Sequence, residues 1–225
     1  MANAQYNIAT PNSLPVRIAA HQRRKMYRAF LQSMSVAPGD TILDVGATSD
    51  RLYDHSNYLE AWYPEKARIT AVGIDADAKV IESIYPGVKF VLADGCALPF
   101  TSSAFDFAHA SAVVEHVGSR HRQSRFLREL WRVARKGVFV TTPNRWFPIE
   151  FHTVLPLLHW LPADAFRALL RLRGDRFFSS EKNLNLLSRN ILAEAAISAD
   201  IPSFRIEAVS LAGWTTNLLL CAYKA

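Results

Sequence analysis

The stretch Thr41–Asp50, TILDVGATSD, determines how the rest of the chain is interpreted. Its first four residues, Thr41–Asp44, are typical of a short buried strand, and Gly46 follows where such a strand must turn sharply toward a helix. A glycine at this turn lets the backbone approach a ligand at the carboxyl edge of a parallel sheet. The three residues at the end of the stretch are small and polar, which suits a helix cap.

Three later segments repeat this pattern, in which an apolar run is followed by a polar turn. Val72–Asp75 (VGID) and Phe90–Asp94 (FVLAD) each end in an acid, and Ala104–Val113 (AFDFAHASAV) contains a fourth strand. Helical stretches lie between these strands. Such alternation predicts a parallel sheet that is covered by helices on both faces, and therefore an α/β fold.

These segments together resemble the class I S-adenosylmethionine-dependent methyltransferases, and most closely the type 11 branch that acts on small molecules. The resemblance lies in LDVG, GID, a strand followed by DGxxLPF, and FDxxHxSxVxEHV, between Thr41 and Pro143. It implies a single domain over 1–225 with a doubly wound, mainly parallel seven-stranded sheet and a C-terminal antiparallel hairpin, the Rossmann-like methyltransferase fold. The family's glycine loop reads GxGxG, whereas Thr48 and Asp50 replace two of the glycines here.

Composition narrows the class of protein. Half of the 225 residues are hydrophobic, which is enough for one sizeable core. The chain has no apolar run of about 18 residues, and its N-terminus lacks the basic-then-apolar order of a signal peptide. Cys96 and Cys221 are far apart and indicate reduced core thiols of a cytoplasmic protein. The net charge of +6 allows a phosphorylated substrate, an anionic membrane surface or nucleic acid, although a solvated basic surface explains it as well.

The two ends of the chain add helices and a cap to the predicted sheet. Apolar residues at helical spacing in Val16–Met34 predict an amphipathic helix that covers the sheet or closes over the cofactor, within an N-terminal arm over 1–36. After a strand at Gly137–Thr141, the segment Thr142–Pro162 contains four prolines and cannot be one regular helix, so we expect a cap over 142–182. The remaining elements are expected as helices at Ala76–Tyr85, Arg120–Arg135, Ala163–Arg173 and Asn183–Ala199, and as strands at Phe204–Leu211 and Asn217–Tyr223.

The cap holds more aromatic and aliphatic residues than a surface loop needs. Because it follows the fifth strand at the carboxyl edge, where open α/β sheets bind ligands, we expect it to form the wall of an acceptor pocket. Arg145, Glu150 and His152 are polar groups within it that could hold a polar acceptor. A dimer interface or a membrane-contact surface is the alternative.

A methyl donor with an adenosine end and an amino-acid end needs acceptors for the hydrogen bonds of its ribose and its adenine. The resemblance implies that two acids provide them. It implies that Asp75 accepts hydrogen bonds from the ribose hydroxyls, although Asp75 could instead cap the next helix and Asp77 is a nearby alternative. It also implies that Asp94 accepts from the adenine amine, with the backbone of Gly95 or Cys96 against the ring. An ordinary Asp-Gly turn is the other explanation for that segment.

The methionine portion of the donor is expected along the backbone of the first turn. Gly46, Ala47 and Thr48 would pass it, and Asp44 would fix the loop through hydrogen bonds unless it is a buried acid paired with backbone. Ser111, at the end of the fourth strand, completes the cofactor site that the resemblance implies.

The transfer itself needs few side chains. Methyl transfer from a sulfonium is a one-step displacement, so alignment of donor and acceptor supplies much of the acceleration. If a base is needed, His116, just past the fourth strand, is the best candidate, and its alternative role is to hold the loop. His152 and His159 in the cap are further candidates. No histidine, cysteine or acid has the spacing of a metal site, so no metal is expected.

Three functions follow from these observations. The first is a cytoplasmic methyltransferase that uses S-adenosylmethionine on a small or lipid-like acceptor, by O- or C-methylation, with peripheral membrane contact allowed by the charge. The second is a binding or regulatory protein of the same fold without transfer, which the altered glycine loop suggests. The third is an RNA methyltransferase. Nucleic acid is the less expected partner, because the chain has neither an Asp/Asn-Pro-Pro-Tyr segment nor an outward row of stacking aromatics.

Overall fold

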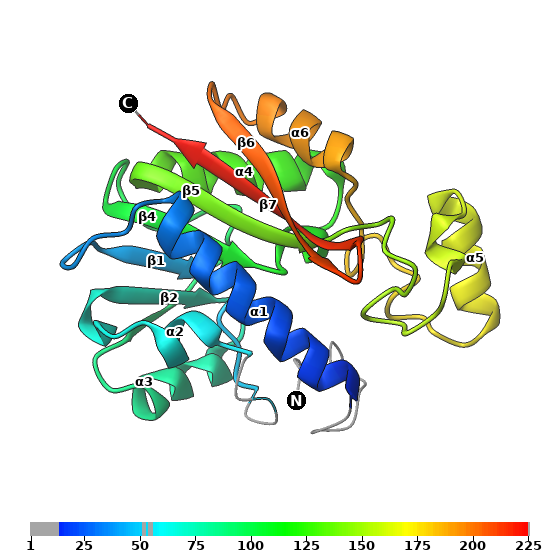
Figure 1. Cartoon of the computed structure of the whole chain (residues 1–225), viewed down its shortest axis with the longest axis horizontal. Coiled ribbons are helices and arrows are strands. Elements are labelled where there is room, and N and C mark those ends of the chain that lie inside the picture. The colour runs from blue at the N-terminus through cyan, green and yellow to red at the C-terminus, as the bar shows by residue number, and fades with distance from the viewer. Residues whose placement is uncertain (1–13, 51–52, 54–55, 225) are drawn as a thin grey trace.

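A seven-stranded sheet forms the centre of the computed structural model, which describes residues 14–50, 53 and 56–224 (Figure 1). Its order is β3-β2-β1-β4-β5-β7-β6. Strands β1 to β5 pair in parallel, and β7 runs antiparallel to both β5 and β6, so the predicted fold is confirmed. The strands are β1 Ile42–Val45, β2 Ile69–Gly73, β3 Lys89–Leu92, β4 Phe105–Ser111, β5 Ala134–Pro143, β6 Phe204–Leu211 and β7 Trp214–Tyr223.

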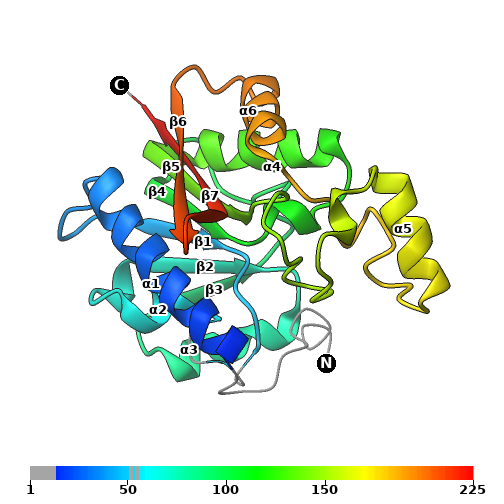
Figure 2. The same cartoon turned by 45° about the vertical axis from the view of Figure 1, so that its right-hand side comes forward.

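Helices cover both faces of the sheet (Figures 1 and 2). Successive side chains of a strand point to opposite faces, so Leu43 and Val45 of β1 join the core beneath α4 and α6, whereas Ile42 joins the core beneath α1. Phe30 of α1 is fully buried against that second core. The helices are α1 Leu14–Ser33, α2 Tyr58–Trp62, α3 Ile81–Ile84, α4 Arg120–Val133, α5 Ala163–Leu172 and α6 Arg189–Ser198, with short 3-10 turns η2 Lys66–Arg68, η3 Ala76–Val80, η4 Val114–His116 and η5 Leu158–Trp160.

The cap departs from the sheet after β5, and its helix α5 stands to one side of the layers (Figure 1). It has a small core of its own, formed by Phe166, Leu170, Phe178, Leu184 and Leu186. As predicted, its proline-rich beginning is not one regular helix. The cap is therefore a separately packed unit that is fastened to the domain rather than an extension of the sheet.

The helix predicted over Asn183–Ala199 is wrong in its first third. Helix α6 begins only after Ser188, whose Oγ accepts from the Ile191 amide and caps the helix. Leu184 and Leu187 lie at helical spacing, but they are buried in two different places, the cap core and the main core. A helix would direct both to one face, so the segment is extended instead and forms the return path from the cap.

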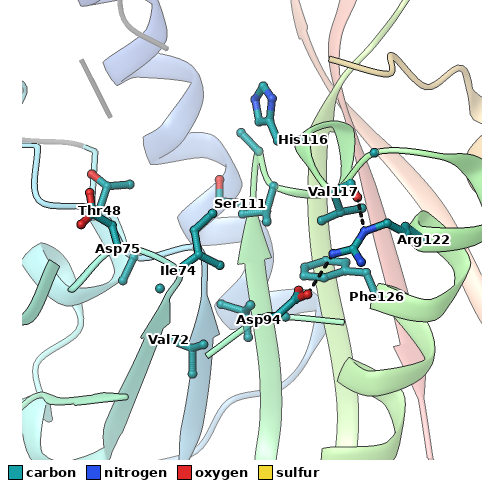
Figure 3. A pocket seen from close by; sticks show the side chains of 18 of the residues that line it. Thr48, Val72, Ile74, Asp75, Asp94, Ser111, His116, Val117, Arg122 and Phe126 are labelled. Atoms are coloured by element: carbon teal, nitrogen blue, oxygen red, sulfur yellow. Dashed lines mark hydrogen bonds and ion pairs between the residues drawn. The ribbon is translucent and has the colours of Figure 1, made fainter. Parts of the chain in front are cut away.

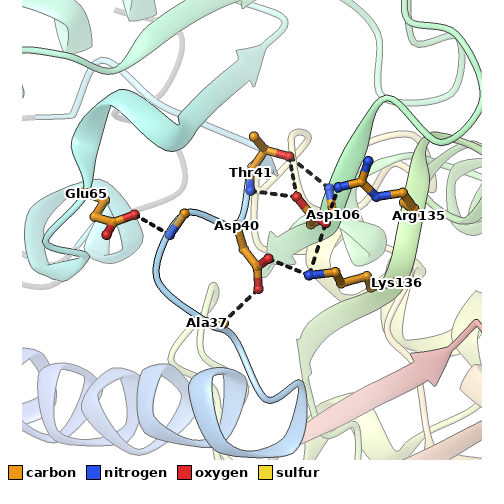
Figure 4. A network of polar contacts seen from close by, with 8 residues as sticks. Ala37, Asp40, Thr41, Glu65, Asp106, Arg135 and Lys136 are labelled. Carbon is orange, nitrogen blue, oxygen red and sulfur yellow. Dashed lines mark hydrogen bonds and ion pairs between the residues drawn. The ribbon is translucent and has the colours of Figure 1, made fainter.

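A network of charges joins the start of β1 to the starts of β4 and β5, at the end of the sheet opposite the carboxyl edge (Figure 4). Asp106 is buried and accepts from the amide of Thr41 at 3.0 Å and from its hydroxyl at 2.9 Å. Its other oxygen lies 2.6 Å from Nη2 of Arg135 and 3.2 Å from Nζ of Lys136, which also pairs with Asp40. These contacts fix three parallel strands in register.

A long helix near the N-terminus packs on the sheet. The amphipathic helix expected at Val16–Met34 corresponds to α1, while residues 1–13 of the expected arm lie outside the described residues. Within the part of the chain that the structure describes, no helix has both the length and the apolar character needed to cross a bilayer.

Candidate active site

A cavity of about 790 Å³ opens beside the turns that follow β1, β2, β3 and β4 (Figure 3). Its walls come from these turns, from α1, from the first half of α4 and from the cap. The strand order reverses between β1 and β4, and open α/β sheets bind ligands at the carboxyl edge beside such a reversal. The volume lies in the range of about 300–1,000 Å³ that is usual for small-ligand sites.

The turn after β1 requires its glycine. Gly46 has a φ of +117°, and a Cβ there would lie 2.1 Å from Cγ2 of Val113. The amides of Gly46 and Ala47 both donate to the carbonyl of Val72, at 2.8 and 2.9 Å, which ties the turn to β2. Gly46, Ala47 and Thr48 all line the cavity.

The other two glycines of the family's loop are not needed in this chain. Thr48 and Asp50 have no positive φ, so a side chain adds no backbone strain at either position. Asn57 holds the loop instead, because its Oδ1 accepts from the Thr48 amide at 3.0 Å and its Nδ2 donates to the Thr48 carbonyl at 2.9 Å. The Thr48 hydroxyl also accepts from the Asp50 amide.

Asp75 stands at the end of β2 and faces the cavity with an oxygen that lacks a partner (Figure 3). Its Oδ1 accepts from the Asp77 amide at 3.0 Å and caps the turn η3. Its Oδ2 is buried and has no hydrogen-bond partner among the residues that the structure describes. A buried acceptor of this kind calls for a donor, such as a ligand hydroxyl. Asp77 is not among the described residues that line the cavity.

Asp94 and Gly95 line the cavity on the side of α4. Oδ1 of Asp94 accepts from the Cys96 amide and Oδ2 lies 2.9 Å from Nη2 of Arg122. Burial opposes ionisation, but these donors outweigh it and lower the pKa of Asp94. A Cβ on Gly95 would lie 2.6 Å from the ring of Phe126, so the backbone here is as close to that ring as it can be.

Two of the predicted cofactor residues lie outside the described lining of the cavity. Cys96 is buried, and its thiol faces the carbonyl of Arg122. Asp44 is also buried, and its Oδ1 lies 2.6 Å from Nδ1 of His109 rather than on the loop. Burial raises the pKa of Asp44 to about 7. Ser111 does line the cavity and shares a hydrogen bond of 3.0 Å with the hydroxyl of Thr141.

The two histidines proposed for catalysis meet at the cap end of the cavity. Nε2 of His116 lies 3.0 Å from Nε2 of His152, and both residues line the cavity. Nδ1 of His152 is 2.6 Å from Oε1 of Glu150, and Nδ1 of His116 is 2.6 Å from the carbonyl of Asn183. Glu115 lies beside them and accepts from a threonine hydroxyl of β5. His159 does not join this cluster. Its Nε2 donates a hydrogen bond to the carbonyl of Phe147 instead.

The surroundings set the charge of each group in this cluster. Burial and, to a smaller extent, the nearby His152 lower the pKa of His116 to about 3. Burial also favours the neutral form of His152, but the charge of Glu150 outweighs it and raises the pKa of His152. Burial opposes ionisation of Glu150, yet His152 holds its pKa at about 2. Glu115 has a pKa raised to about 7 because it is buried.

The cap contributes polar rather than apolar groups to the cavity. Among the described residues, it lines the cavity only with His152, Glu181 and Lys182. The aromatic residues that the sequence suggested for the wall contact one another instead, as Trp146 does with Trp160 at a centroid distance of 6.2 Å. Several apolar side chains of the cap remain exposed, namely Trp146, Ile149, Phe151, Val154, Leu157, Trp160 and Leu161.

Residues 43–141, which run from β1 to β5 and carry most of the cavity, match the model of a family described as a methyltransferase domain. These residues make up a methyltransferase domain of the type 11 kind. The protein is therefore an enzyme, and S-adenosylmethionine is its methyl donor. No curated protein matches the sequence of this methyltransferase.

Solved structures share the fold of the methyltransferase at low sequence identity. Magnesium protoporphyrin IX methyltransferase from Synechocystis PCC 6803, solved with bound SAH, is 13% identical with a TM-score of 0.60, over 100% of this chain and 93% of that chain. A methyltransferase from Methanosarcina mazei is 16% identical with a TM-score of 0.54, over 85% and 94%. Another from Aquifex aeolicus is 15% identical with a TM-score of 0.54, over 89% and 97%.

Sequence reasoning missed three residues that shape the site of the methyltransferase. Asn57 fixes the first turn, Arg122 pairs with Asp94, and Glu115 lies beside both histidines. Glu115 had a signal, since it directly precedes His116 in the family's EHV motif. Asn57 had none, because its contact with the turn depends on the path of the chain between them.

Proposed function

We propose that the enzyme transfers the methyl group to an oxygen of a small or lipid-like acceptor that lies beside His116 and His152. The observation that carries this proposal is the chain of contacts from Glu150 to His152 to His116 at one end of the cavity. A carboxylate behind an imidazole holds its tautomer and favours its protonated form, which is the arrangement of a histidine that takes up a proton.

The residues around the donor fit S-adenosylmethionine. The unpartnered Oδ2 of Asp75 would accept from a ribose hydroxyl, which supplies the donor that this buried oxygen lacks. Gly46–Thr48 would lie along the methionine portion, and Asp94 with Gly95 would lie beside the adenine. Once bound, S-adenosylmethionine supplies a methyl group on a positively charged sulfur. The chain's own task is to hold both partners in line.

An acceptor hydroxyl must lose its proton as the methyl group arrives. Nε2 of His152 would receive that proton, because the charge of Glu150 outweighs burial and favours the protonated imidazole. His116 would stay neutral and accept a hydrogen bond at Nε2. Since a carbon acceptor with an acidic proton is rarer than a hydroxyl, this cluster supports O-methylation over C-methylation.

The cap supports an acceptor with a polar head and an apolar part. Glu181 and Lys182 provide charged groups at the same end of the cavity as His152. The exposed apolar side chains of the cap would contact the apolar part of a lipid-like acceptor, or the membrane that carries it. A binding protein without transfer is no longer supported, because the altered turn still forms a cavity and the family is one of enzymes.

The test uses S-adenosylmethionine with a deuterated methyl group. Purified enzyme is incubated with small-molecule, lipid and RNA fractions, and mass spectrometry locates the label. We expect label on an oxygen of a small molecule or lipid. His152→Gln should reduce kcat by about 100-fold or more while donor affinity is unchanged, and His159→Gln, a cap histidine outside the cavity lining, should behave as wild type. Label on carbon, nitrogen or RNA, or full activity of His152→Gln, would contradict the proposal.

A further inference from the structure

Three groups that commonly bind metal ions meet at the cap end of the cavity. Glu115 and His116 come from η4, and His152 comes from the cap. One ligand atom from each lies within 4.8 Å of the others. Nε2 of His116 is 3.0 Å from Nε2 of His152 and 3.9 Å from Oε1 of Glu115.

The hydrogen bonds behind the two histidines direct both lone pairs into the space between them. The carbonyl of Asn183 can only accept, so Nδ1 of His116 carries a proton and Nε2 of a neutral His116 does not. The oxygens of Glu150 accept from the backbone amides of His152 and Thr153, and Oε1 likewise accepts from Nδ1 of His152. Two neutral imidazoles would therefore face each other with lone pairs, which repel unless a cation lies between them. That cation is either an extra proton on His152 or a metal ion.

Glu115 supplies the second, independent indication. Its side chain is fully buried, and Oε2 accepts from the hydroxyl of Thr142 at 2.9 Å. Its Oε1 is buried as well and has no hydrogen-bond partner within residues 14–50, 53 and 56–224. Leaving such an oxygen unpaired is costly, whereas a bound cation beside the histidines would satisfy it. A proton on Nε2 of His152 would not satisfy Oε1 of Glu115, because that proton would already be shared with His116.

We propose that Glu115, His116 and His152 bind a divalent transition-metal ion, and that Zn²⁺ suits the site best. Two histidines and one carboxylate with an open position form a common zinc site in enzymes. Nitrogen ligands at about 2.0–2.1 Å from a tetrahedral ion lie about 3.3 Å apart, close to the observed separation of the two imidazoles. Glu115 would have to move toward them by about 1 Å to reach the same ion.

The groups behind the three ligands suit a metal site. Ligating histidines usually donate their other ring N–H to a carboxylate or a carbonyl, and here Glu150 and Asn183 accept those bonds. Thr142 holds the second oxygen of Glu115. The charges of Glu115 and Glu150 would balance those of the ion. Mg²⁺ fits poorly, because it prefers oxygen ligands in an octahedron.

The ion would act on the acceptor, a consequence that rests on the proposed O-methylation. His116 keeps 15% of its side chain exposed and lines the cavity, so one side of the ion would face the acceptor. The ion would attract the acceptor oxygen and make its proton easier to lose to solvent. The O–CH₃ bond then forms as the S–CH₃ bond breaks, and the sulfur keeps the electron pair as a neutral thioether.

The direct test measures metal binding by untagged protein that has been freed of metal with a chelator. Co²⁺ is titrated while its visible absorption is recorded, and Zn²⁺ is then added as a competitor. We expect one equivalent of Co²⁺ with the intense spectrum of a tetrahedral site, and displacement by Zn²⁺. His116→Ala and His152→Ala should each weaken binding by about 100-fold or more, and Glu150→Gln by about 10-fold to 100-fold.

Matched variants separate the site from general metal binding by histidine. His159→Ala lies in the same cap and His121→Ala lies on the exposed start of α4, and both should bind Co²⁺ as wild type does. Titration with S-adenosylmethionine shows that each variant is folded. Absence of stoichiometric binding to the wild type, or equal binding by His152→Ala and His159→Ala, would overturn the proposal.

The outcome is separable from that of the proposed function. If no metal binds and O-methylation continues in chelator, the metal site is refuted and His152 acts as the proton acceptor alone. If one equivalent of metal binds through these three residues and the label appears only on carbon, nitrogen or RNA, the metal site stands and the proposed O-methylation fails.

Discussion

Asn57 forms two hydrogen bonds with the backbone of Thr48, one through each atom of its amide group. The pair joins two positions that are nine apart in the chain, one in the turn after β1 and one at the start of α2. In this chain a side chain therefore determines the shape of the backbone beside the cavity, where the family's usual loop has glycines.

Replacement of Asn57 should weaken donor binding more than it affects the fold. Asn57→Ala leaves the amide and the carbonyl of Thr48 without partners, and each lost hydrogen bond costs about 0.5–1.5 kcal/mol. We expect the affinity for S-adenosylmethionine to fall by about 5-fold to 150-fold in calorimetric titration. Asn190→Ala, on the exposed side of α6, is the control. Equal affinities for the two variants would show that the loop does not depend on Asn57.

Asp75 should matter more for the donor than Asp77. Only Asp75 lines the cavity and has a buried oxygen without a partner among the described residues. Loss of a charge-assisted hydrogen bond costs about 1.5–3 kcal/mol, so Asp75→Ala should weaken the affinity by about 10-fold to 150-fold. Asp77→Ala should remain within about twofold. The ribose contact lies elsewhere if the two variants bind equally well.

Asp106 should contribute stability that depends on pH. Burial opposes its ionisation, but the donors of Thr41 and the charges of Arg135 and Lys136 outweigh burial and hold its pKa well below the ordinary value of 3.8. The folded state thus favours the charged form. The contribution is present above about pH 4 and is lost as the pH falls below it.

Urea unfolding of Asp106→Asn tests this linkage. The variant should be less stable than wild type by about 1.5–3 kcal/mol at pH 7, and the difference should shrink as the pH falls below about 4. Asp200→Asn, whose partner Arg128 is exposed, should change stability by less than about 1 kcal/mol at any pH. A difference for Asp106→Asn that stays constant from pH 7 to pH 3 would rule out its ionisation as the cause.

The cap should loosen without loss of donor binding when its own core is weakened. Leu170 is buried in the cap core and has no place in the main cores. Leu170→Ala removes about 2–5 kcal/mol of packing, mostly from the cap. Hydrogen exchange should increase over residues 144–188, whereas the affinity for S-adenosylmethionine should remain within about twofold. Increased exchange in β1 and β4 as well would mean that cap and sheet unfold together.

The sequence predicted the sheet well because each strand carries its own signal. Apolar runs that end in a glycine or an acid predicted the positions of β1, β2 and β3. Because these strands pair in parallel, their carboxyl ends lie at one edge of the sheet. The sequence alone therefore predicted that Asp75 and Asp94 lie at that edge, where both line the cavity. Residues 183–188 could not, because their leucines follow helical spacing but fill two separate cores.

The cluster at the cap end of the cavity could not be predicted from spacing. His152 follows His116 by 36 positions, and the intervening chain forms α4 and β5 before it enters the irregular beginning of the cap. A search for metal ligands by short spacing finds nothing there, which is why no metal was expected. The folded chain brings the two imidazoles together only because Asn183 and Glu150 hold each ring from behind.

The two cysteines have a practical consequence for experiments on cap motion. Cys96 and Cys221 are fully buried, and burial raises the pKa of their thiols to about 11 and about 12. Reagents such as maleimides react with exposed thiolates, so both native cysteines should stay unlabelled in the folded enzyme. A single cysteine introduced at exposed Arg176 in the cap would then carry a fluorophore at one known position, with no need to remove the native thiols first.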